Sequence, residues 1–138
     1  MTRDEAVSRC WSEIDLNALC QNYESAKRRA GDARVFCVLK GNAYGLGAVE
    51  VCRALRRRGA DFFAVASGDE AEELLGAFPD ADVLILGRVG FEQAARLIEL
   101  GAGFTLFGPA YGETLVAAAR RAERKARVHV KEIGRAHV

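Results

Sequence analysis

Lys40 is the residue whose type and position are best suited to chemistry in this sequence. It follows an apolar run, Val35–Leu39, and precedes a glycine-rich turn, Gly41-Asn-Ala-Tyr-Gly-Leu-Gly47. A lysine held between apolar walls loses hydration of its ammonium group, which favours the neutral amine. A neutral amine can condense with an aldehyde cofactor. The alternative, from position alone, is a solvated lysine that ends a strand.

The other residues capable of chemistry do not form a recognisable site. The glycines of the turn are compatible with a generic phosphate-binding α/β module, but their spacing fits neither the dinucleotide fingerprint nor the P-loop. The four cysteines contain no Cys-x-x-Cys pair; they are Cys10, Cys20, Cys37 and Cys52. We expect Cys37 and Cys52 to be buried free thiols rather than parts of a disulfide framework. His129 and His137 have no cysteine or carboxylate cluster around them, so we expect no metal site.

Alternating strands and helices must position Lys40. Residues 11–15 alternate apolar and polar side chains like a short strand, and Asp15 is a candidate N-cap for a helix that ends before Gly31. Apolar runs typical of buried strands then alternate with amphipathic segments. The expected strands are 35–39, 62–66, 83–86, 104–107 and 128–130, and the expected later helices are 49–58, 69–77, 91–100 and 111–126.

This alternation predicts βαβ units in a parallel α/β sheet. The strand pattern alone fits either a doubly wound sheet or the first five strands of an eight-stranded barrel. In both folds, ligands bind at the carboxyl ends of the strands. Lys40 is expected at that edge.

Composition narrows the class of protein. The chain has 138 residues, half of them hydrophobic, with 20 basic and 19 acidic side chains. This balance does not favour binding to nucleic acid or to an anionic membrane. No apolar run approaches the roughly 20 residues that span a bilayer, and residues 1–11 lack the apolar core of a signal peptide. We expect a cytoplasmic protein.

Several segments carry a resemblance to a known family. Val38-Leu-Lys-Gly-Asn-Ala-Tyr-Gly-Leu-Gly47 is similar to the cofactor-lysine signature of alanine racemases. Three further segments match the family in the same order; they are Trp11–Leu19 with Asn22, Gly59–Ala66 followed by Asp69–Ala71, and Val83–Gly87. The resemblance runs from Trp11 to Lys131. It implies a partial (β/α)8 TIM-type barrel, about the first five strands, preceded by an N-terminal strand and helix.

The resemblance also implies a function. Alanine racemases use pyridoxal 5'-phosphate (PLP) to convert L-alanine to D-alanine for cell-wall precursors, and they work as homodimers. Lys40 falls on the lysine that holds PLP and acts as one of two acid/base groups. Tyr44 falls on a tyrosine that contacts the cofactor phosphate, with a tyrosine packed over the barrel mouth as the alternative. Lys131 matches a lysine that is often carbamylated, or is a strand-end lysine without a role.

Two departures and one rival function qualify this reading. Leu46 replaces the family's usual histidine and Gly41 its alanine, changes that fit a cofactor role but could mark a racemase of serine or of a basic amino acid. The rival is a non-catalytic PLP-binding protein of the same barrel type, which carries the cofactor for homeostasis. Those proteins usually have a Ser-Lys-Thr motif, whereas this chain has Leu-Lys-Gly around Lys40.

The domain organisation follows from the same resemblance. We expect residues 1–131 to be a truncated N-terminal PLP-binding barrel domain, inactive by itself because the second catalytic base lies outside it. Residues 132–138 read like the translation of a sequencing adapter. We expect a non-native read-through tail in which Arg135 and His137 have no function, with a natural polar C-terminus as the alternative.

Overall fold

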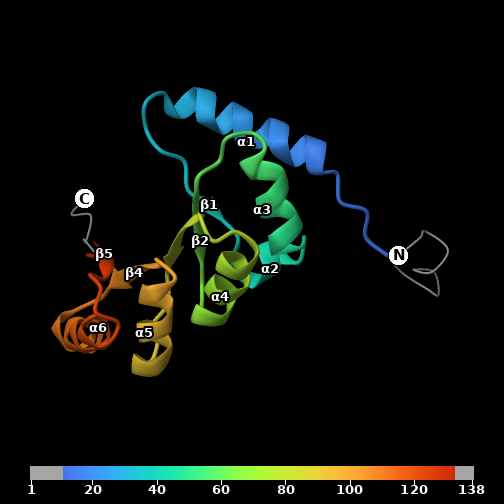
Figure 1. Cartoon of the computed structure of the whole chain (residues 1–138). Coiled ribbons are helices and arrows are strands. Elements are labelled where there is room, and N and C mark those ends of the chain that lie inside the picture. The colour runs from blue at the N-terminus through green and yellow to red at the C-terminus, as the bar shows by residue number, and fades with distance from the viewer. Residues whose placement is uncertain (1–10, 133–138) are drawn as a thin grey trace.

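The computed structural model describes residues 11–132, so the expectations for Cys10 and for residues 133–138 lie outside the described residues. Five strands form one sheet, and helices precede and separate them (Figure 1). The strands are β1 (Cys37–Val38), β2 (Phe62–Val65), β3 (Asp82–Ile85), β4 (Gly103–Leu106) and β5 (Arg127–Val130). The helices are α1 (Leu16–Ala30), α2 (Lys40–Tyr44), α3 (Ala48–Arg56), α4 (Gly68–Ala77), α5 (Phe91–Glu99) and α6 (Pro109–Arg121).

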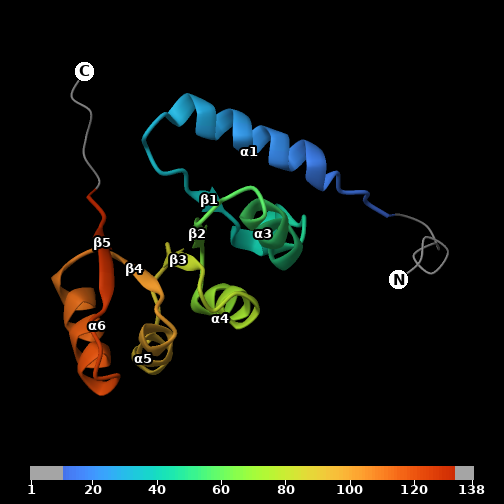
Figure 2. The ribbon, with the colours of Figure 1, turned by 45° about the horizontal axis from the view of Figure 1, so that its top comes forward.

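The strand order decides between the two folds that the sequence left open. All neighbours pair in parallel, in the order β1-β2-β3-β4-β5. A doubly wound sheet changes direction at a switch point, whereas a barrel adds each strand beside the one before it. Figure 2 shows α3, α4, α5 and α6 following one another along the outer side of the strands. The sheet is therefore the first part of a (β/α)8 barrel, as predicted.

The two faces of the sheet differ in how they are covered. Alternate strand residues, such as Phe63, Val83 and Phe104, pack with the helices in the main hydrophobic core. The opposite face, which is the interior of a barrel, carries a smaller cluster formed by Phe62, Ala64 and Leu84. Both faces of β2 are buried, so all four of its residues are apolar. This uninterrupted apolar run is the reason that the strand could be predicted from the sequence.

Two expectations at the start of the chain are wrong. Residues 11–15 form no strand, because this segment leads into α1, which packs on α3 rather than beside a sheet edge. The run Val35–Leu39 yields only the two-residue strand β1, and Phe36 and Val38 are 39% and 38% exposed instead of buried. These two side chains alternate with buried Cys37 and Leu39, so β1 is half-covered.

The helices follow local signals. The Asp15 carboxylate accepts hydrogen bonds from the backbone N–H groups of Asn17 and Ala18 at 2.9 and 3.0 Å, which confirms Asp15 as the N-cap of α1. The last helix ends at Arg121 rather than at residue 126. Glu123 has a φ of 51°, a conformation that ends a right-handed helix.

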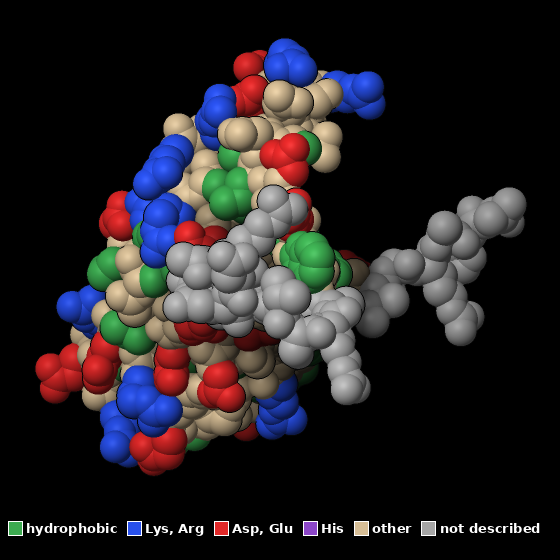
Figure 3. Space-filling model, turned by 90° about the vertical axis from the view of Figure 1, so that its right-hand side faces the viewer, with side chains coloured by type: hydrophobic (Ala, Val, Ile, Leu, Met, Phe, Trp, Pro, Cys, Tyr) green, Lys and Arg blue, Asp and Glu red, His purple; other side chains and the backbone are tan. Residues whose placement is uncertain are grey.

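The surface agrees with the balanced composition. Acidic and basic side chains are interspersed over the face in Figure 3. Within residues 11–132, no helix has both the length and the apolar character required to cross a membrane.

Candidate active site

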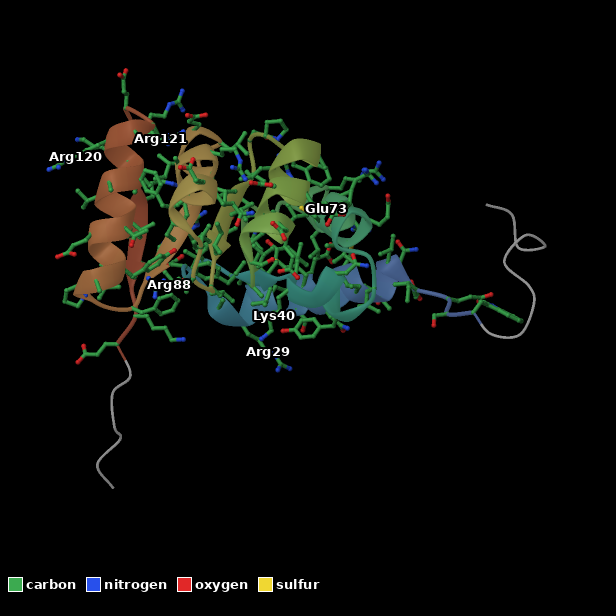
Figure 4. The ribbon with its side chains drawn as sticks, turned by 90° about the horizontal axis from the view of Figure 1, so that it is seen from below. Arg29, Lys40, Glu73, Arg88, Arg120 and Arg121 are labelled. Atoms are coloured by element: carbon green, nitrogen blue, oxygen red, sulfur yellow. The ribbon has the colours of Figure 1, made fainter. Side chains whose placement is uncertain are left out.

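Lys40 lies directly after β1, at the carboxyl edge of the sheet. The Leu39 N–H donates to the Ala64 carbonyl oxygen at 2.8 Å, which prolongs the pairing of β1 with β2 up to the residue before Lys40. In Figure 4 Lys40 and Arg88, which follows β3, lie toward one side, and Arg120 and Arg121 of α6 lie toward the other. The predicted position of Lys40 at the strand ends is confirmed.

The surroundings of Lys40 differ from the expectation. Its side chain is exposed rather than held between apolar walls, and Val38, two residues earlier, is itself 38% exposed. Among residues 11–132, no carboxylate forms an ion pair with Lys40. The amine is therefore accessible to a ligand at this edge.

The turn that follows Lys40 has an unusual backbone. Gly41, Asn42, Ala43 and Tyr44 have φ angles of 62°, 53°, 53° and 56°, so α2 is a left-handed turn. Left-handed conformation costs most non-glycine residues about 1–2 kcal/mol and is tolerated by asparagine, so Ala43 and Tyr44 together store roughly 2–4 kcal/mol. Strain of this kind is concentrated at functional sites, where the surrounding structure sustains it. Gly41, a departure from the family's alanine, adopts this region without penalty.

Backbone hydrogen bonds and one side chain hold the turn. The Ala43 N–H donates to Leu39 O at 2.8 Å, and the Gly45 N–H donates to Gly41 O at 2.9 Å. The Asn42 side-chain oxygen accepts from the Ala48 N–H at 2.7 Å and so caps α3. This role of Asn42 was not predicted from the sequence, although asparagine is a residue that tolerates left-handed backbone and caps helices.

A second residue that sequence reasoning missed is Glu70, in the first turn of α4. Its Oε1 accepts from the Gly41 N–H at 2.6 Å, and its Oε2 accepts from the Ala66 N–H at 2.7 Å. Oε2 also accepts from the Ser67 N–H at 3.4 Å, and the Ser67 hydroxyl accepts from the Glu70 N–H at 3.3 Å. The Ser-x-x-Glu pattern signals a capping box. Nothing in that pattern indicates the bond to Gly41, 29 residues earlier.

Tyr44 ends the left-handed turn, four residues after Lys40. Its side chain is 66% exposed, and no hydrogen bond to its hydroxyl is formed within the described part of the chain. The ring borders an apolar groove of about 340 Å³ between α1, β1 and α2, which Leu46 also lines. One turn thus carries both the candidate amine and the candidate phenol.

Lys131 lies at the same edge of the sheet but after β5, the strand farthest from β1 in the sheet order. Its N–H donates to Leu106 O at 2.9 Å, and its ammonium lies 5.6 Å from the centre of the Phe107 ring. Phe107 stacks on Tyr111 with ring centres 5.6 Å apart, and the Arg88 guanidinium lies 5.5 Å from the Tyr111 ring centre. The structure brings Lys40 and Tyr44 together and leaves Lys131 on the opposite flank.

The opposite edge of the sheet, away from Lys40, carries ion pairs and contacts between aromatic rings. The Arg34 guanidinium pairs with Asp61 and Asp82 at 3.4 and 3.3 Å, and Arg127 pairs with Asp82 at 2.8 Å. Nearby, the Phe36, Phe62 and His129 rings contact one another on the barrel-interior face. His129 therefore packs against aromatic rings, which fits a structural role.

Within residues 11–132, neither thiols nor metal ligands form a competing site. Cys20, Cys37 and Cys52 are buried free thiols, which confirms the expectation for the last two. Burial, with a smaller effect of Asp61, raises the pKa of Cys37 to about 11, and burial likewise raises that of Cys52 to about 11. Within the described ranges, no group of three or more His, Cys, Asp or Glu side chains is placed to bind a metal ion.

Comparison with known proteins identifies the relatives of this arrangement. Residues 14–132 match the family model described as "Alanine racemase, N-terminal domain". "Alanine racemase 2" of Caldanaerobacter subterraneus is 41% identical over 120 residues, covering 86% of this chain and 31% of the relative. "Alanine racemase" of Symbiobacterium thermophilum is 40% identical over 121 residues, covering 88% and 32%.

Solved structures give the same result. "Alanine Racemase from Streptomyces coelicolor A3(2)" superposes with a TM-score of 0.82 at 29% identity, covering 87% of this chain and 32% of the other. The alanine racemase of Clostridium difficile 630 in complex with cycloserine has a TM-score of 0.81 at 30% identity, covering 90% and 33%. The chain spans about a third of the length of these relatives.

Proposed function

The chain belongs to the alanine racemase N-terminal domain family, as its motifs suggested, and we propose that it forms the first part of the PLP-binding barrel of an alanine racemase. The observation that carries the proposal is Lys40, an exposed amine at the carboxyl end of β1 on a strained left-handed turn within the family match. The whole enzyme would convert L-alanine to D-alanine in the cytoplasm and supply cell-wall precursors. Serine or a basic amino acid is the alternative substrate.

The residues of the turn fit the proposed cofactor chemically. Lys40 provides a primary amine for the aldehyde, and Tyr44 provides an exposed hydroxyl that can donate a hydrogen bond to a phosphate oxygen. The two are separated by a single turn, so one rigid segment would hold both ends of the cofactor. When bound, PLP supplies an electron sink that stabilises negative charge at the substrate α-carbon.

The role of Lys40 in the reaction is proton transfer. Racemization removes the α-proton on one face and returns a proton on the other, which requires two acid/base groups. Lys40 would serve as the acid/base group on one face of the substrate. The second base, the arginine beside the pyridine nitrogen and the homodimer partner would come from outside this chain. Residues 1–131 alone would therefore be inactive.

Lys131 would have a supporting role. Its side chain lies beside Phe107 at the carboxyl end of β5, and the motif that contains it matches the one in which the family lysine is often carbamylated. A carbamylated side chain there would present a negative charge to a cationic neighbour. We propose this role for Lys131, with residues 132–138 as a tail outside the barrel domain.

The test uses the full-length protein that carries this chain. The protein is mixed with PLP, reduced with borohydride and digested, and the modified peptide is identified by mass spectrometry. We expect the adduct on Lys40, and Lys40→Ala should abolish both the adduct and D-alanine formation. Lys125→Ala is the matched control, because Lys125 is an exposed lysine just before β5, at the opposite edge of the sheet. Normal turnover by Lys40→Ala would overturn the assignment.

A further inference from the structure

We propose that Glu70 is a positioning residue for Lys40, a role that rests on the proposed function. Glu70 lies in α4, yet its carboxylate bonds to the peptide that directly follows Lys40. The Gly41 N–H is the first N–H of the left-handed turn and donates to Oε1 at 2.6 Å. The other carboxylate oxygen accepts from the Ala66 N–H at 2.7 Å, just beyond β2. One side chain thus joins the segments that leave β1 and β2.

The geometry indicates more than a helix cap. In a capping box the glutamate reaches the N–H of the N-cap residue. Here that bond, from Ser67 to Oε2, is the longest of the three at 3.4 Å. The two short bonds go to Gly41 and Ala66, and short bonds to a carboxylate are the strong, charge-assisted kind. The carboxylate is therefore directed mainly at the Lys40 turn and the β2 exit.

The strain of the turn explains why such a link is needed. Asn42, Ala43 and Tyr44 all have left-handed backbone, which an isolated segment would leave for right-handed or extended conformations. The Gly41 N–H is fixed by the carboxylate, and its carbonyl oxygen accepts from the Gly45 N–H at 2.9 Å. Because Gly41 is fixed, the Cα–Cβ bond of Lys40 points in a defined direction at the end of β1. The amine then samples fewer positions before it meets an aldehyde.

Glu70→Gln is the sharpest variant because it keeps the shape of the side chain. Glutamine has one acceptor oxygen, so it cannot accept from Gly41 and Ala66 through two oxygens, and it loses the charge. Two controls separate the possible roles. Ser67→Ala removes the hydroxyl that accepts from the Glu70 N–H and leaves the carboxylate in place. Glu73→Gln makes the same charge change at an exposed position of α4, away from Lys40 in Figure 4.

The first readout needs no cofactor. Amide hydrogen exchange of the full-length protein is followed at Gly41 and Ala66 by mass spectrometry or NMR. Loss of a charge-assisted bond should speed exchange there by roughly ten-fold or more in Glu70→Gln. Glu73→Gln should leave these amides unchanged, and Ser67→Ala should affect mainly the first turn of α4.

The second readout measures Lys40 itself. The affinity for PLP, from the borohydride-reduced adduct on Lys40, should fall roughly ten-fold in Glu70→Gln and stay within about two-fold of the parent in both controls. In turnover, kcat should fall while the KM for alanine changes less, because the substrate contacts remain.

The outcomes distinguish the inference from the function on which it rests. If the parent protein forms the Lys40 adduct and Glu70→Gln matches it in exchange and in PLP affinity, the inference is overturned and the function stands. If Ser67→Ala reproduces every effect of Glu70→Gln, Glu70 is only a helix cap and the inference is again overturned. If the parent protein forms no adduct on Lys40, the proposed function falls and the inference falls with it.

Discussion

The Tyr111 hydroxyl accepts a hydrogen bond from the backbone N–H of Val89 at 3.0 Å, in a buried position that joins α6 to the segment after β3. Burial raises the pKa of Tyr111 above its ordinary value, while the bond to Val89 acts in the opposite direction. Tyr111 also stacks on Phe107, which lies beside Lys131. This contact therefore supports one flank of the candidate site.

Removing the Tyr111 hydroxyl should destabilise the protein. Tyr111→Phe leaves the buried Val89 N–H without its acceptor, which should lower the free energy of unfolding by about 1–3 kcal/mol. Tyr44→Phe is the matched control, since the Tyr44 ring is 66% exposed, and it should change stability by less than about 0.5 kcal/mol. Urea unfolding measures both. Equal stabilities of the two variants would contradict the role of the buried bond.

The same Tyr44 variant bears on cofactor binding. If the Tyr44 hydroxyl contacts the phosphate of PLP, Tyr44→Phe should weaken PLP binding by roughly ten-fold, the size expected for a hydrogen bond to a charged group. Tyr111→Phe should affect binding less than stability. Titration of the cofactor-free, full-length protein with PLP, followed by absorbance, gives both affinities. An unchanged affinity in Tyr44→Phe would remove Tyr44 from the site.

The left-handed turn predicts opposite effects of one substitution at two glycines. Gly45 has a φ of 85° and open space around its Cβ position, so Gly45→Ala should cost about 1–2 kcal/mol for conformational reasons alone. Gly76 lies in α4 with ordinary φ and open space, so Gly76→Ala should stabilise by about 0.5–1 kcal/mol. The same urea experiment compares them. A stabilising Gly45→Ala would mean that the turn is not left-handed at this residue.

Gly87, just after β3, tests the packing of the strand exits. A Cβ at Gly87 would collide with the Ala66 carbonyl oxygen, which belongs to the segment that Glu70 holds. Gly87→Ala should therefore cost about 1–3 kcal/mol and shift the backbone near Ala66. Gly90→Ala, with no atom within 4 Å of the added Cβ, is the control. Thermal unfolding should separate the two variants by several degrees; coincident transitions would argue against the close approach.

The buried thiols make stability depend on alkaline pH. Burial raises the folded-state pKa of Cys37 and of Cys52 to about 11, above the ordinary value of 9.0 for a cysteine thiol. The unfolded chain then loses these protons at lower pH than the folded protein, so their contribution is present below pH 9 and is lost as pH rises toward 11. Unfolding at pH 8 to 10.5 should show this decline, and Cys37→Ala and Cys52→Ala should each make the decline shallower. The same slope in all three proteins would exclude the thiols as its cause.

Much of the fold could be predicted from the sequence because its signals are local. The apolar run of β2 and the Asp15 cap of α1 act through nearby residues, so the sequence reveals them directly. Strand order depends on contacts between distant segments and came only from the resemblance. The segment 11–15 has the alternation of a strand but, among the residues that the structure describes, no neighbouring strand to pair with, and alternation alone does not make a sheet.

The residues of the candidate site also differ in whether a local sequence signal reveals them. Lys40 and Tyr44 were identified from a motif. The left-handed backbone of Ala43 and Tyr44, in contrast, opposes the intrinsic preferences of alanine and tyrosine, so residue propensities do not predict it. Glu70 was missed because its partner Gly41 lies 29 residues away. Local rules fail here in the way expected of strained functional segments.

The sequential strand order has a consequence for how the protein is made. Each strand pairs with the one that precedes it in the chain, so β2 finds β1, and β3 finds β2, among residues that have already left the ribosome. Paired strand residues are 19 to 26 positions apart, so each pairing closes a shorter loop, at a lower entropic cost, than a pairing of the two ends of the chain would. The half-barrel can therefore assemble one βα unit at a time as translation proceeds, with the Lys40 turn among the first parts to take shape.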